Sequence, residues 1–324
     1  MRAPKIIITS GDVNGIGLRC FAGAVEQLQT NAELHLAISP SVLRSCIDCY
    51  QLAPSIDGKV WTVGSHTIII EPLDEPVSVH PGVAADDASR HAIASLGFAF
   101  EGVRNGVYDA VVTLPINKHA LGQVGWEYPG QTEMAAAFAE GDPLMVLCTR
   151  TLHVALATVH VPLRGVADAL TTAGVLRRIV QLHDHLRTRV QIDEPRIAVL
   201  GLNPHAGEQG RIGVEDENVI RPAIEKARQM GIDATGPIAA DGFFGFGAYQ
   251  HVDGVLAMYH DQGLIPLKLL AKGAGVNVTA GLSIIRTSPD HGTAYDTVRS
   301  TNIDSASTQL AIEMAIEMSH HTRL

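Results

Sequence analysis

The chain has 324 residues, of which 46% are hydrophobic and 18% charged, and its formal net charge is −10. This composition is typical of a compact soluble enzyme, and the acidic balance argues against a nucleic-acid-binding surface, which needs a basic stripe. No apolar run reaches the roughly 18–20 residues that span a bilayer, and the N-terminus lacks the features of a secretory signal. We therefore expect a cytoplasmic protein with no nucleic-acid and no membrane partner.

The first half of the sequence alternates short buried strands with amphipathic helices. Strands are predicted at Ile6–Thr9, Leu34–Ser39 and Ala110–Thr113, a hairpin within Trp61–Glu71, and helices at Leu18–Leu28, Val42–Leu52 and Ala85–Arg104. The turn Gly11–Gly17 joins the first strand to the first helix. Its spacing, G-x3-G-x-G, is not the dinucleotide fingerprint G-x-G-x-x-G, so a tight turn and an anion-binding turn both explain its glycines.

The second half continues the same alternation. Strands are predicted at Leu144–Cys148, Val154–Val159, Ile197–Leu202, Gly254–Met258, Gly275–Thr279 and Leu282–Arg286, and helices at Thr172–Leu186, Glu215–Met230 and Ala306–Ser319. Strands separated by helices predict an α/β fold with a largely parallel, doubly wound sheet.

The cysteines are too few and too scattered for a disulfide framework in a chain of this length. They are Cys20, Cys46, Cys49 and Cys148. Cys46 and Cys49 form one C-x-x-C pair, but no second pair follows to complete a zinc ribbon. Cys20 and Cys148 are interpreted as small apolar residues that fill the core.

Three histidines lie at or just past the ends of predicted buried strands: His160 in ATVHVPL, His205 in GLNPHAGE and His260 in AMYHDQG. In α/β proteins the side chains at strand ends reach a cleft while the backbone behind them stays rigid. Three imidazoles placed in this way can bind one divalent metal ion and leave positions open for a substrate. Each histidine alone is better explained as an ordinary half-buried residue. The polar residues that surround all three nevertheless favour a shared site.

Cationic side chains gather in the stretch from Met258 to Asp290. Lys268 lies in an apolar setting, IPLKLLAKG, where a lysine needs a partner. Arg286 ends the predicted strand LSII, so we expect its guanidinium to project into the cleft and bind a carboxylate or phosphate. This cluster favours an anion-binding site over structural ion pairs. The polar segments PINK (Pro115–Lys118) and GQTE (Gly130–Glu133) are further candidates, although each alone is equally explained as a surface loop.

The segments GLNPHAGE, AMYHDQG and VNVTAGLSIIRTSPDHGTAYD resemble the 4-hydroxythreonine-4-phosphate dehydrogenase family, NAD-dependent enzymes of vitamin B6 (pyridoxine) synthesis. The resemblance runs from GDVNGIG through PINK, GQTE, ATVHVPL and GPIAADGFF to the end of the chain. It implies an isocitrate/isopropylmalate dehydrogenase-like α/β fold, with two interleaved subdomains around a central active-site cleft and divisions near residues 130–150 and 275–290. It also implies a homodimer with the active site at the subunit interface.

The resemblance also implies roles for particular residues. One divalent ion, Zn, Mg, Co or Mn, would be held by His160, His205 and His260, the last from the partner subunit. The position of an acid near the metal falls on Asp241. Asp261 directly follows His260 in the sequence, so we also expect it to accept a hydrogen bond from an imidazole N–H. The implied substrate contacts are Gln131, Thr132, Lys268, Asn277 and Arg286. No residue is assigned to NAD, because no dinucleotide fingerprint marks its site.

The expected reaction is a metal-assisted oxidation of 4-phosphohydroxy-L-threonine to 3-amino-2-oxopropyl phosphate, with hydride passing to NAD and loss of CO₂. Lys268 or Asp241 would help to remove the hydroxyl proton. Arg286, Lys268 and Thr132 would hold the anionic ends of the substrate.

Three segments depart from the family pattern. Relatives usually read GHTE where this chain has GQTE, so Gln131 replaces a substrate-binding imidazole with an amide that carries no charge. The first glycine turn reads GDVNGIG in place of GDPAGIG, and Asp296–Ser300 replaces an A-G-K/R motif. The substrate therefore stays open: 4-phospho-D-threonate, 4-phospho-D-erythronate and an aromatic cis-dihydrodiol are alternatives, as are a metal-binding paralogue without turnover and a metal-dependent phosphohydrolase.

Overall fold

The computed structural model describes residues 2–52 and 55–321 of the chain. These residues fold into two compact units, each of which is a mixed α/β structure. Unit 1 comprises the chain up to Gly141 and again from Leu282 to the end of the described residues, and unit 2 comprises Asp142–Gly281. Within the described residues, none of the helices combines the length and the apolar character that crossing a bilayer requires.

Unit 1 contains a mostly parallel sheet in the strand order β13-β6-β1-β2-β5-β4-β3. The pairs from β13 to β5 are parallel, and β5, β4 and β3 form an antiparallel edge that includes the hairpin predicted within Trp61–Glu71. The strands are β1 (Lys5–Thr9), β2 (Glu33–Ala37), β3 (Ile56–Asp57), β4 (Val60–Val63), β5 (His66–Glu71), β6 (Ala110–Val112) and β13 (Arg286–Pro289).

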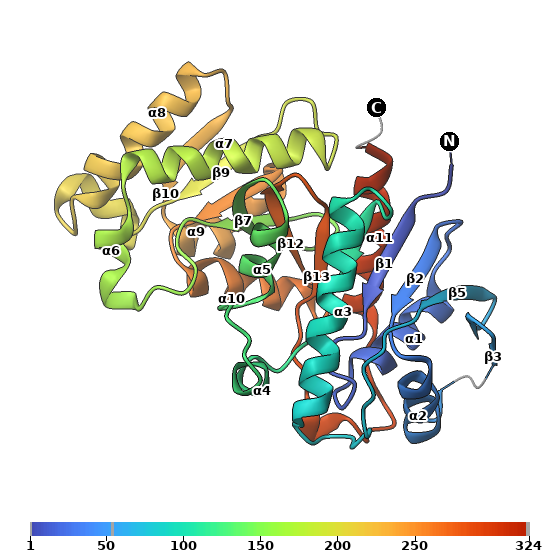
Figure 1. The fold of residues 1–324 in the computed structure, drawn as a ribbon. Coiled ribbons are helices and arrows are strands. Elements are labelled where there is room, and N and C mark those ends of the chain that lie inside the picture. The colour runs from blue at the N-terminus through green and yellow to red at the C-terminus, as the bar shows by residue number, and fades with distance from the viewer. Residues whose placement is uncertain (1, 53–54, 322–324) are drawn as a thin grey trace. The chain divides into compact units, whose positions relative to one another are not determined.

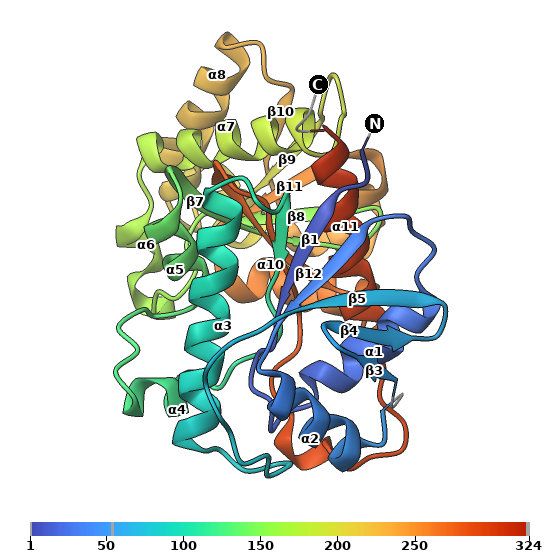
Figure 2. The ribbon, with the colours of Figure 1, turned by 45° about the vertical axis from the view of Figure 1, so that its right-hand side comes forward.

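Helices cover both faces of the unit 1 sheet, which is why Ile6, Ile7 and Ile8 of β1 are all fully buried. Helix α3 (Asp86–Arg104) packs on one face, and α1 (Gly17–Gln27) and α11 (Ala306–His321) lie on the other (Figure 2). The remaining helices of this unit are α2 (Pro40–Tyr50), α4 (Lys118–Gln123) and α5 (Gln131–Phe138). The doubly wound arrangement predicted for the first half of the sequence is confirmed.

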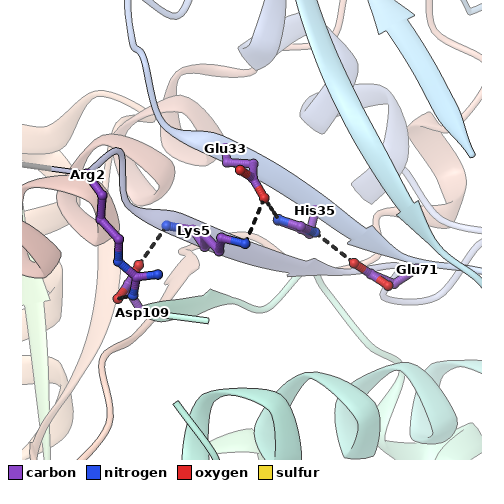
Figure 3. A network of polar contacts seen from close by, with 6 residues as sticks. All are labelled: Arg2, Lys5, Glu33, His35, Glu71 and Asp109. Atoms are coloured by element: carbon purple, nitrogen blue, oxygen red, sulfur yellow. Dashed lines mark hydrogen bonds and ion pairs between the residues drawn. The ribbon is translucent and has the colours of Figure 1, made fainter. Parts of the chain in front are cut away.

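A row of polar contacts crosses neighbouring strands of unit 1 (Figure 3). It joins Arg2, Asp109, Lys5, Glu33, His35 and Glu71 in that order. Buried His35 lies at its centre, between carboxylates at 2.7 and 2.8 Å, and its ring packs edge-on against Tyr108. Each residue in the row contacts another residue of the row, so the row links these strands of unit 1.

The strands of unit 2 follow the order β10-β9-β11-β8-β7-β12. The pairs among β10, β9, β11 and β8 are parallel, and β7 is antiparallel to β8. The strands are β7 (Gly141–Cys148), β8 (His153–Leu156), β9 (Ile197–Leu200), β10 (Ala234–Ile238), β11 (Gly254–Ala257) and β12 (Val276–Leu282). Helices α7 (Thr172–Thr188) and α8 (Arg221–Gln229) lie on one face and α10 (His260–Ala271) on the other (Figure 1). The short helices are α6 (Val166–Ala169) and α9 (Ala240–Gly245).

Two predicted elements of the second half are wrong in detail. The strand expected at Leu282–Arg286 does not form: β12 continues to Leu282, and β13 begins at Arg286. Leu282 and Ile284 are both buried in the core of unit 1. Their alternation along the chain resembles that of a strand, although the segment is irregular. The single helix expected at Glu215–Met230 is a π-helical turn (Asp216–Ile220) followed by α8, because Pro222 has no N–H to continue the α-helical ladder.

Candidate metal and substrate site

The three histidines singled out in the sequence follow three adjacent parallel strands of unit 2. His160 follows β8, His260 follows β11 and His205 follows β9, and β11 lies between the other two strands. Parallel strands have their carboxyl ends at one edge of a sheet, and this edge is where α/β proteins bind ligands. Three imidazoles therefore leave the same edge of one sheet.

The ends of β8 and β11 are held together by hydrogen bonds that continue past the strands. The backbone N–H of Thr158 donates to the carbonyl of Met258 over 3.2 Å, and the Thr158 hydroxyl donates to the same oxygen over 2.7 Å. The rings of His160 and His260 lie beyond this clamp, with their centroids 6.3 Å apart and their planes inclined by 34°. The structure therefore brings these two candidate ligands together.

Gln262 joins the ends of β11 and β9 in a similar way. Its Oε1 accepts from the backbone N–H of Met258 over 2.7 Å, and its Nε2 donates to the carbonyl of Gly201 over 2.6 Å. The sequence places Gln262 next to the candidate ligands but does not reveal this role, because the bond to Gly201 spans 61 positions of the chain.

His205 lies in an unusual left-handed segment. The residues from His205 to Gln209 all have φ between 44° and 77°, a region that costs roughly 1–2 kcal/mol for each non-glycine residue. Buried Asp216 anchors the segment that leads into this turn: its carboxylate accepts from the backbone N–H groups of Leu202 and Asn203 and from the Asn203 side chain. Strain of this kind is retained where the surrounding structure enforces it, commonly at functional sites.

Asp261 accepts or shares the proton of Nδ1 of His260 over 2.7 Å, as expected for an acid that orients a metal-binding imidazole. The contact fixes the His260 ring and leaves Nε2 as the nitrogen that can bind a metal ion. Both side chains are accessible, with 39% of the His260 side chain exposed.

Three further candidates lie in unit 2. Asp241 is in the first turn of α9 and is exposed. Lys268 is on α10 and is also exposed, and its apolar neighbours Ile265 and Leu269 are 59% and 72% exposed. Asn277 is on β12, and its Oδ1 is a buried acceptor without a hydrogen-bond partner among the described residues. An unpaired buried acceptor of this kind is suited to a substrate donor.

The candidates in unit 1 are Gln131, Thr132 and Arg286. Gln131 and Thr132 begin helix α5, which the sequence did not predict. Nη2 of Arg286 donates to Oε1 of Gln131 over 2.6 Å, and Nε and Nη2 both donate to Oγ1 of Thr113. Arg286 is only 2% exposed. The expectation that it ends a strand and projects into a cleft is therefore corrected: it begins β13 and is packed behind Gln131.

Burial lowers the pKa of Arg286 to about 10, against the opposing effect of the nearby Glu133 carboxylate. At neutral pH the guanidinium still carries its charge. Its Nε and Nη2 donate to side chains of its own unit, which hold the positive charge beside Gln131.

The glycine turn after β1 has a structural explanation. The backbone N–H groups of Asp12, Asn14, Gly15 and Ile16 all donate within unit 1. A Cβ on Gly11 would lie 2.6 Å from the carbonyl oxygen of Pro115, and Gly11 has φ +59°. These glycines are required by close packing, and the four occupied N–H groups do not form an anion cradle.

A second group of metal-binding side chains lies elsewhere in unit 2. Among the described residues, Cys148, His153 and His185 have ligand atoms that all lie within 4.8 Å of one another, whereas His160, His205 and His260 do not form such a group in one chain. The sequence analysis interpreted Cys148 as a small apolar residue. The missed signal was the spacing of Cys148 and His153, which flank a four-residue connection (149–152) between two predicted strands.

Comparisons with known proteins agree with this fold. The family described as "Pyridoxal phosphate biosynthetic protein PdxA" matches residues 26–315. A 4-hydroxythreonine-4-phosphate dehydrogenase of Bacteroides thetaiotaomicron is 39% identical over 323 residues, which cover 97% of this chain and 88% of that protein.

Two solved structures match most of the chain. The structure of a 4-hydroxythreonine-4-phosphate dehydrogenase from Klebsiella pneumoniae has a TM-score of 0.83 and 35% identity and covers 98% of both chains. A terephthalate 1,2-cis-dihydrodiol dehydrogenase from Burkholderia xenovorans LB400 has a TM-score of 0.65 and 27% identity, also over 98% of both chains. The chain belongs to the PdxA family, as the motifs GLNPHAGE and AMYHDQG indicated.

Proposed function

We propose that this chain is an NAD-linked oxidoreductase that converts 4-phosphohydroxy-L-threonine to 3-amino-2-oxopropyl phosphate, with loss of CO₂, in the synthesis of pyridoxine 5'-phosphate. Membership of the PdxA family and the names of its relatives support this activity. The observation that carries the proposal is the exit of His160, His260 and His205 from three adjacent parallel strands. Imidazoles that leave this sheet edge in each subunit, with His260 supplied by the partner subunit, fit a catalytic metal ion with open positions.

The metal and the cofactor supply the central chemistry. When bound, a divalent ion (Zn, Mg, Co or Mn) would polarise the substrate hydroxyl, and NAD would accept the hydride. The side chains orient the ligands, remove a proton and bind the substrate. Asp261 holds the ring of His260, Lys268 or Asp241 takes the hydroxyl proton, and unpaired Oδ1 of Asn277 accepts from a substrate donor.

The anionic ends of the substrate need positive charge and hydrogen-bond donors. Thr132 lies at the start of α5 and offers a hydroxyl. Lys268 supplies an ammonium group with three donors, and Arg286 supplies a fixed charge behind Gln131.

We propose an isocitrate/isopropylmalate dehydrogenase-like arrangement of the two units and a homodimer in which His260 reaches the site of the partner subunit. Exposed apolar side chains of α10 support self-association: Ile265, Leu269 and Leu270 are 59%, 72% and 40% exposed. Contiguous exposed apolar surface is typical of protein interfaces. Because α10 begins at His260, its burial between two subunits would bring this imidazole to the interface.

A second candidate function is the same oxidation of a different substrate. Gln131 favours it, because an amide replaces the imidazole usual in the family and is held by Arg286 and Thr113. The related structure of a dihydrodiol dehydrogenase supports the idea that this fold accepts other hydroxylated substrates. The candidates are 4-phospho-D-threonate, 4-phospho-D-erythronate and an aromatic cis-dihydrodiol.

The test is NADH formation with each of the four substrates in the presence of Mg²⁺, Mn²⁺, Co²⁺ or Zn²⁺. The proposal expects the highest kcat/KM with 4-phosphohydroxy-L-threonine, and a higher value with another substrate would favour the second candidate. Phosphate release without NAD would indicate a phosphohydrolase, and bound metal without NADH on any substrate would indicate a paralogue without turnover.

Variants of two histidines connect the activity to the proposed site. His205→Ala should abolish oxidation and remove the metal ion from the site at the strand ends, with an unchanged circular dichroism spectrum. His251→Ala is the matched control, because His251 is exposed in the same unit but does not follow a strand. An active His205→Ala variant would overturn the assigned role.

A further inference from the structure

The group formed by Cys148, His153 and His185 lies at the opposite end of the strands from the three histidines described above. Cys148 is the last residue of β7 and His153 the first residue of β8, and the two are directly opposite each other in the antiparallel register. Sγ of Cys148 is 3.1 Å from Nδ1 of His153. His160, in contrast, follows the carboxyl end of β8.

Helix α7 brings the third side chain to this point. The ring of His185 packs edge-on against that of His153, with the centroids 5.7 Å apart. Gly254 of β11 pairs with His153, and a Cβ on Gly254 would lie 2.7 Å from Cδ1 of Leu186. The glycine therefore lets α7 lie close to the sheet at the level of His153, and His185 is carried into the group.

The polar atoms of the group are buried but incompletely bonded. His153 is 6% exposed, His185 3% and Cys148 fully buried. Among the described residues, neither ring nitrogen of His185 has a hydrogen-bond partner. Buried polar groups are almost always bonded, so a buried imidazole with two unpaired nitrogens needs an explanation.

Burial also sets the protonation of the two imidazoles. It lowers the pKa of His153 to about 4, which the charge of Asp253 partly opposes, and it lowers the pKa of His185 to about 3. Burial therefore favours the neutral form of each ring, whose lone pair can bind a metal ion. A neutral imidazole and a cysteine sulfur are the ligands that zinc prefers in structural sites.

We propose that Cys148, His153 and His185 bind one Zn²⁺ ion that joins the β7–β8 hairpin to helix α7, separately from the metal site at the strand ends. Tetrahedral ligands at about 2.0–2.3 Å from zinc lie roughly 3.3–3.8 Å from one another, so ligand atoms within 4.8 Å need only small rotations to close around the ion. As the S–Zn bond forms, the Cys148 thiol loses its proton to solvent: one Zn²⁺ enters and one H⁺ leaves. The charge of Asp253 near His153 offsets part of the remaining positive charge.

The experiment uses the full chain in a His205→Ala background, which is expected to empty the site at the strand ends. The protein is produced in cobalt-supplemented medium, and its metal content and absorption spectrum are measured. Thiolate bound to Co²⁺ gives a sulfur-to-metal charge-transfer band that a site made only of histidines cannot give. The proposal expects about one Co²⁺ per chain with this band, and loss of both the ion and the band on adding Cys148→Ala.

Cys20→Ala is the matched control, because Cys20 is also buried and free but lies in unit 1. It should keep the ion and the band. A His185→Gln variant provides a second test in case Cys148→Ala misfolds. It should bind the metal ion at least tenfold more weakly. Absence of the charge-transfer band in folded, cobalt-grown His205→Ala protein would overturn the proposal and leave a Cys148–His153 hydrogen bond as the only role of the group.

Discussion

Nη2 of Arg286 donates to Oε1 of Gln131 over 2.6 Å, and Oγ1 of Thr113 donates to the same oxygen over 2.9 Å. The amide of Gln131 also donates from Nε2 to the carbonyl of Leu114. Gln131 therefore fastens the first turn of α5 to the ends of β6 and β13. Gln131 thus supports the packing of unit 1 and is also a candidate substrate contact.

Gln131→Leu removes the acceptor of a buried guanidinium. We expect a loss of about 1.5–3 kcal/mol in the free energy of unfolding, because hydrogen bonds to charged groups contribute this much. Urea denaturation measures it, and Gln229→Leu, on the exposed face of α8, is the control and should change stability by less than about 0.5 kcal/mol.

A double-mutant cycle with Arg286→Leu separates the free energy of the Arg286–Gln131 hydrogen bond from the other effects of each substitution on stability. The two substitutions should couple by about 0.5–3 kcal/mol, because the residues are in direct contact. Strictly additive effects would mean that the contact contributes nothing to stability.

Asp261→Asn tests the orientation of His260. An amide cannot accept the Nδ1 proton as strongly as a carboxylate, so the affinity of the site at the strand ends for Co²⁺ or Zn²⁺ should fall by about 10–100-fold. Isothermal titration calorimetry measures this change. Asp184→Asn is a matched control, since Asp184 contacts the neighbouring His183 in the same i, i+1 arrangement on α7. Equal metal affinities of the two variants would contradict the role of Asp261.

Asp216→Asn tests the support of the left-handed turn at His205. The new amide would direct N–H donors at the N–H groups of Leu202 or Asn203, so we expect a loss of roughly 2–3 kcal/mol in stability. Metal affinity at the strand ends should fall as well, because His205 is no longer held in place. Glu215→Gln is the control: its side-chain oxygen can still accept from Asn203. Unchanged metal binding in folded Asp216→Asn protein would limit Asp216 to a purely structural role.

Much of the fold follows from the sequence because hydrophobic periodicity is a local signal. Strands such as Ile6–Thr9 and Gly254–Met258 are apolar on both faces, as buried parallel strands require, and each lies within about a residue of its predicted position. The same signal placed His160, His205 and His260 after strands. Their common sheet edge depends on strand order, which periodicity does not encode.

The sequence failed where long-range contacts override local pattern. The segment Leu282–Arg286 looks like a strand, yet the chain passes from β12 to β13 there. Helix α10 was missed because Gly263 and Pro266 lower its helix propensity, and packing on β8 and β11 compensates for them. The contact of His185 with His153 could not be predicted from local sequence, because its partners lie more than 30 positions earlier in the chain.

His91 of α3 predicts a pH dependence of stability. It is fully buried, Nε2 accepts from the backbone N–H of Ser39 over 3.1 Å, and Nδ1 lies 3.2 Å from the Ser10 hydroxyl. Burial lowers the pKa of His91 from 6.5 to about 4. The folded state therefore binds fewer protons than the unfolded state between these two pH values. The stabilisation is present above pH 6.5 and is lost as the pH falls towards 4.

We expect protonation of His91 to lower the free energy of unfolding by about 3 kcal/mol between pH 6.5 and 4, since one pKa unit corresponds to about 1.4 kcal/mol. His91→Gln can keep both hydrogen bonds but cannot be protonated, so its free energy of unfolding should fall less steeply between pH 6.5 and 4 than that of the wild type. His119→Gln, at an exposed position on α4, should follow the wild-type curve. Parallel curves for wild type and His91→Gln in urea denaturation would show that another group controls the acid sensitivity of the fold.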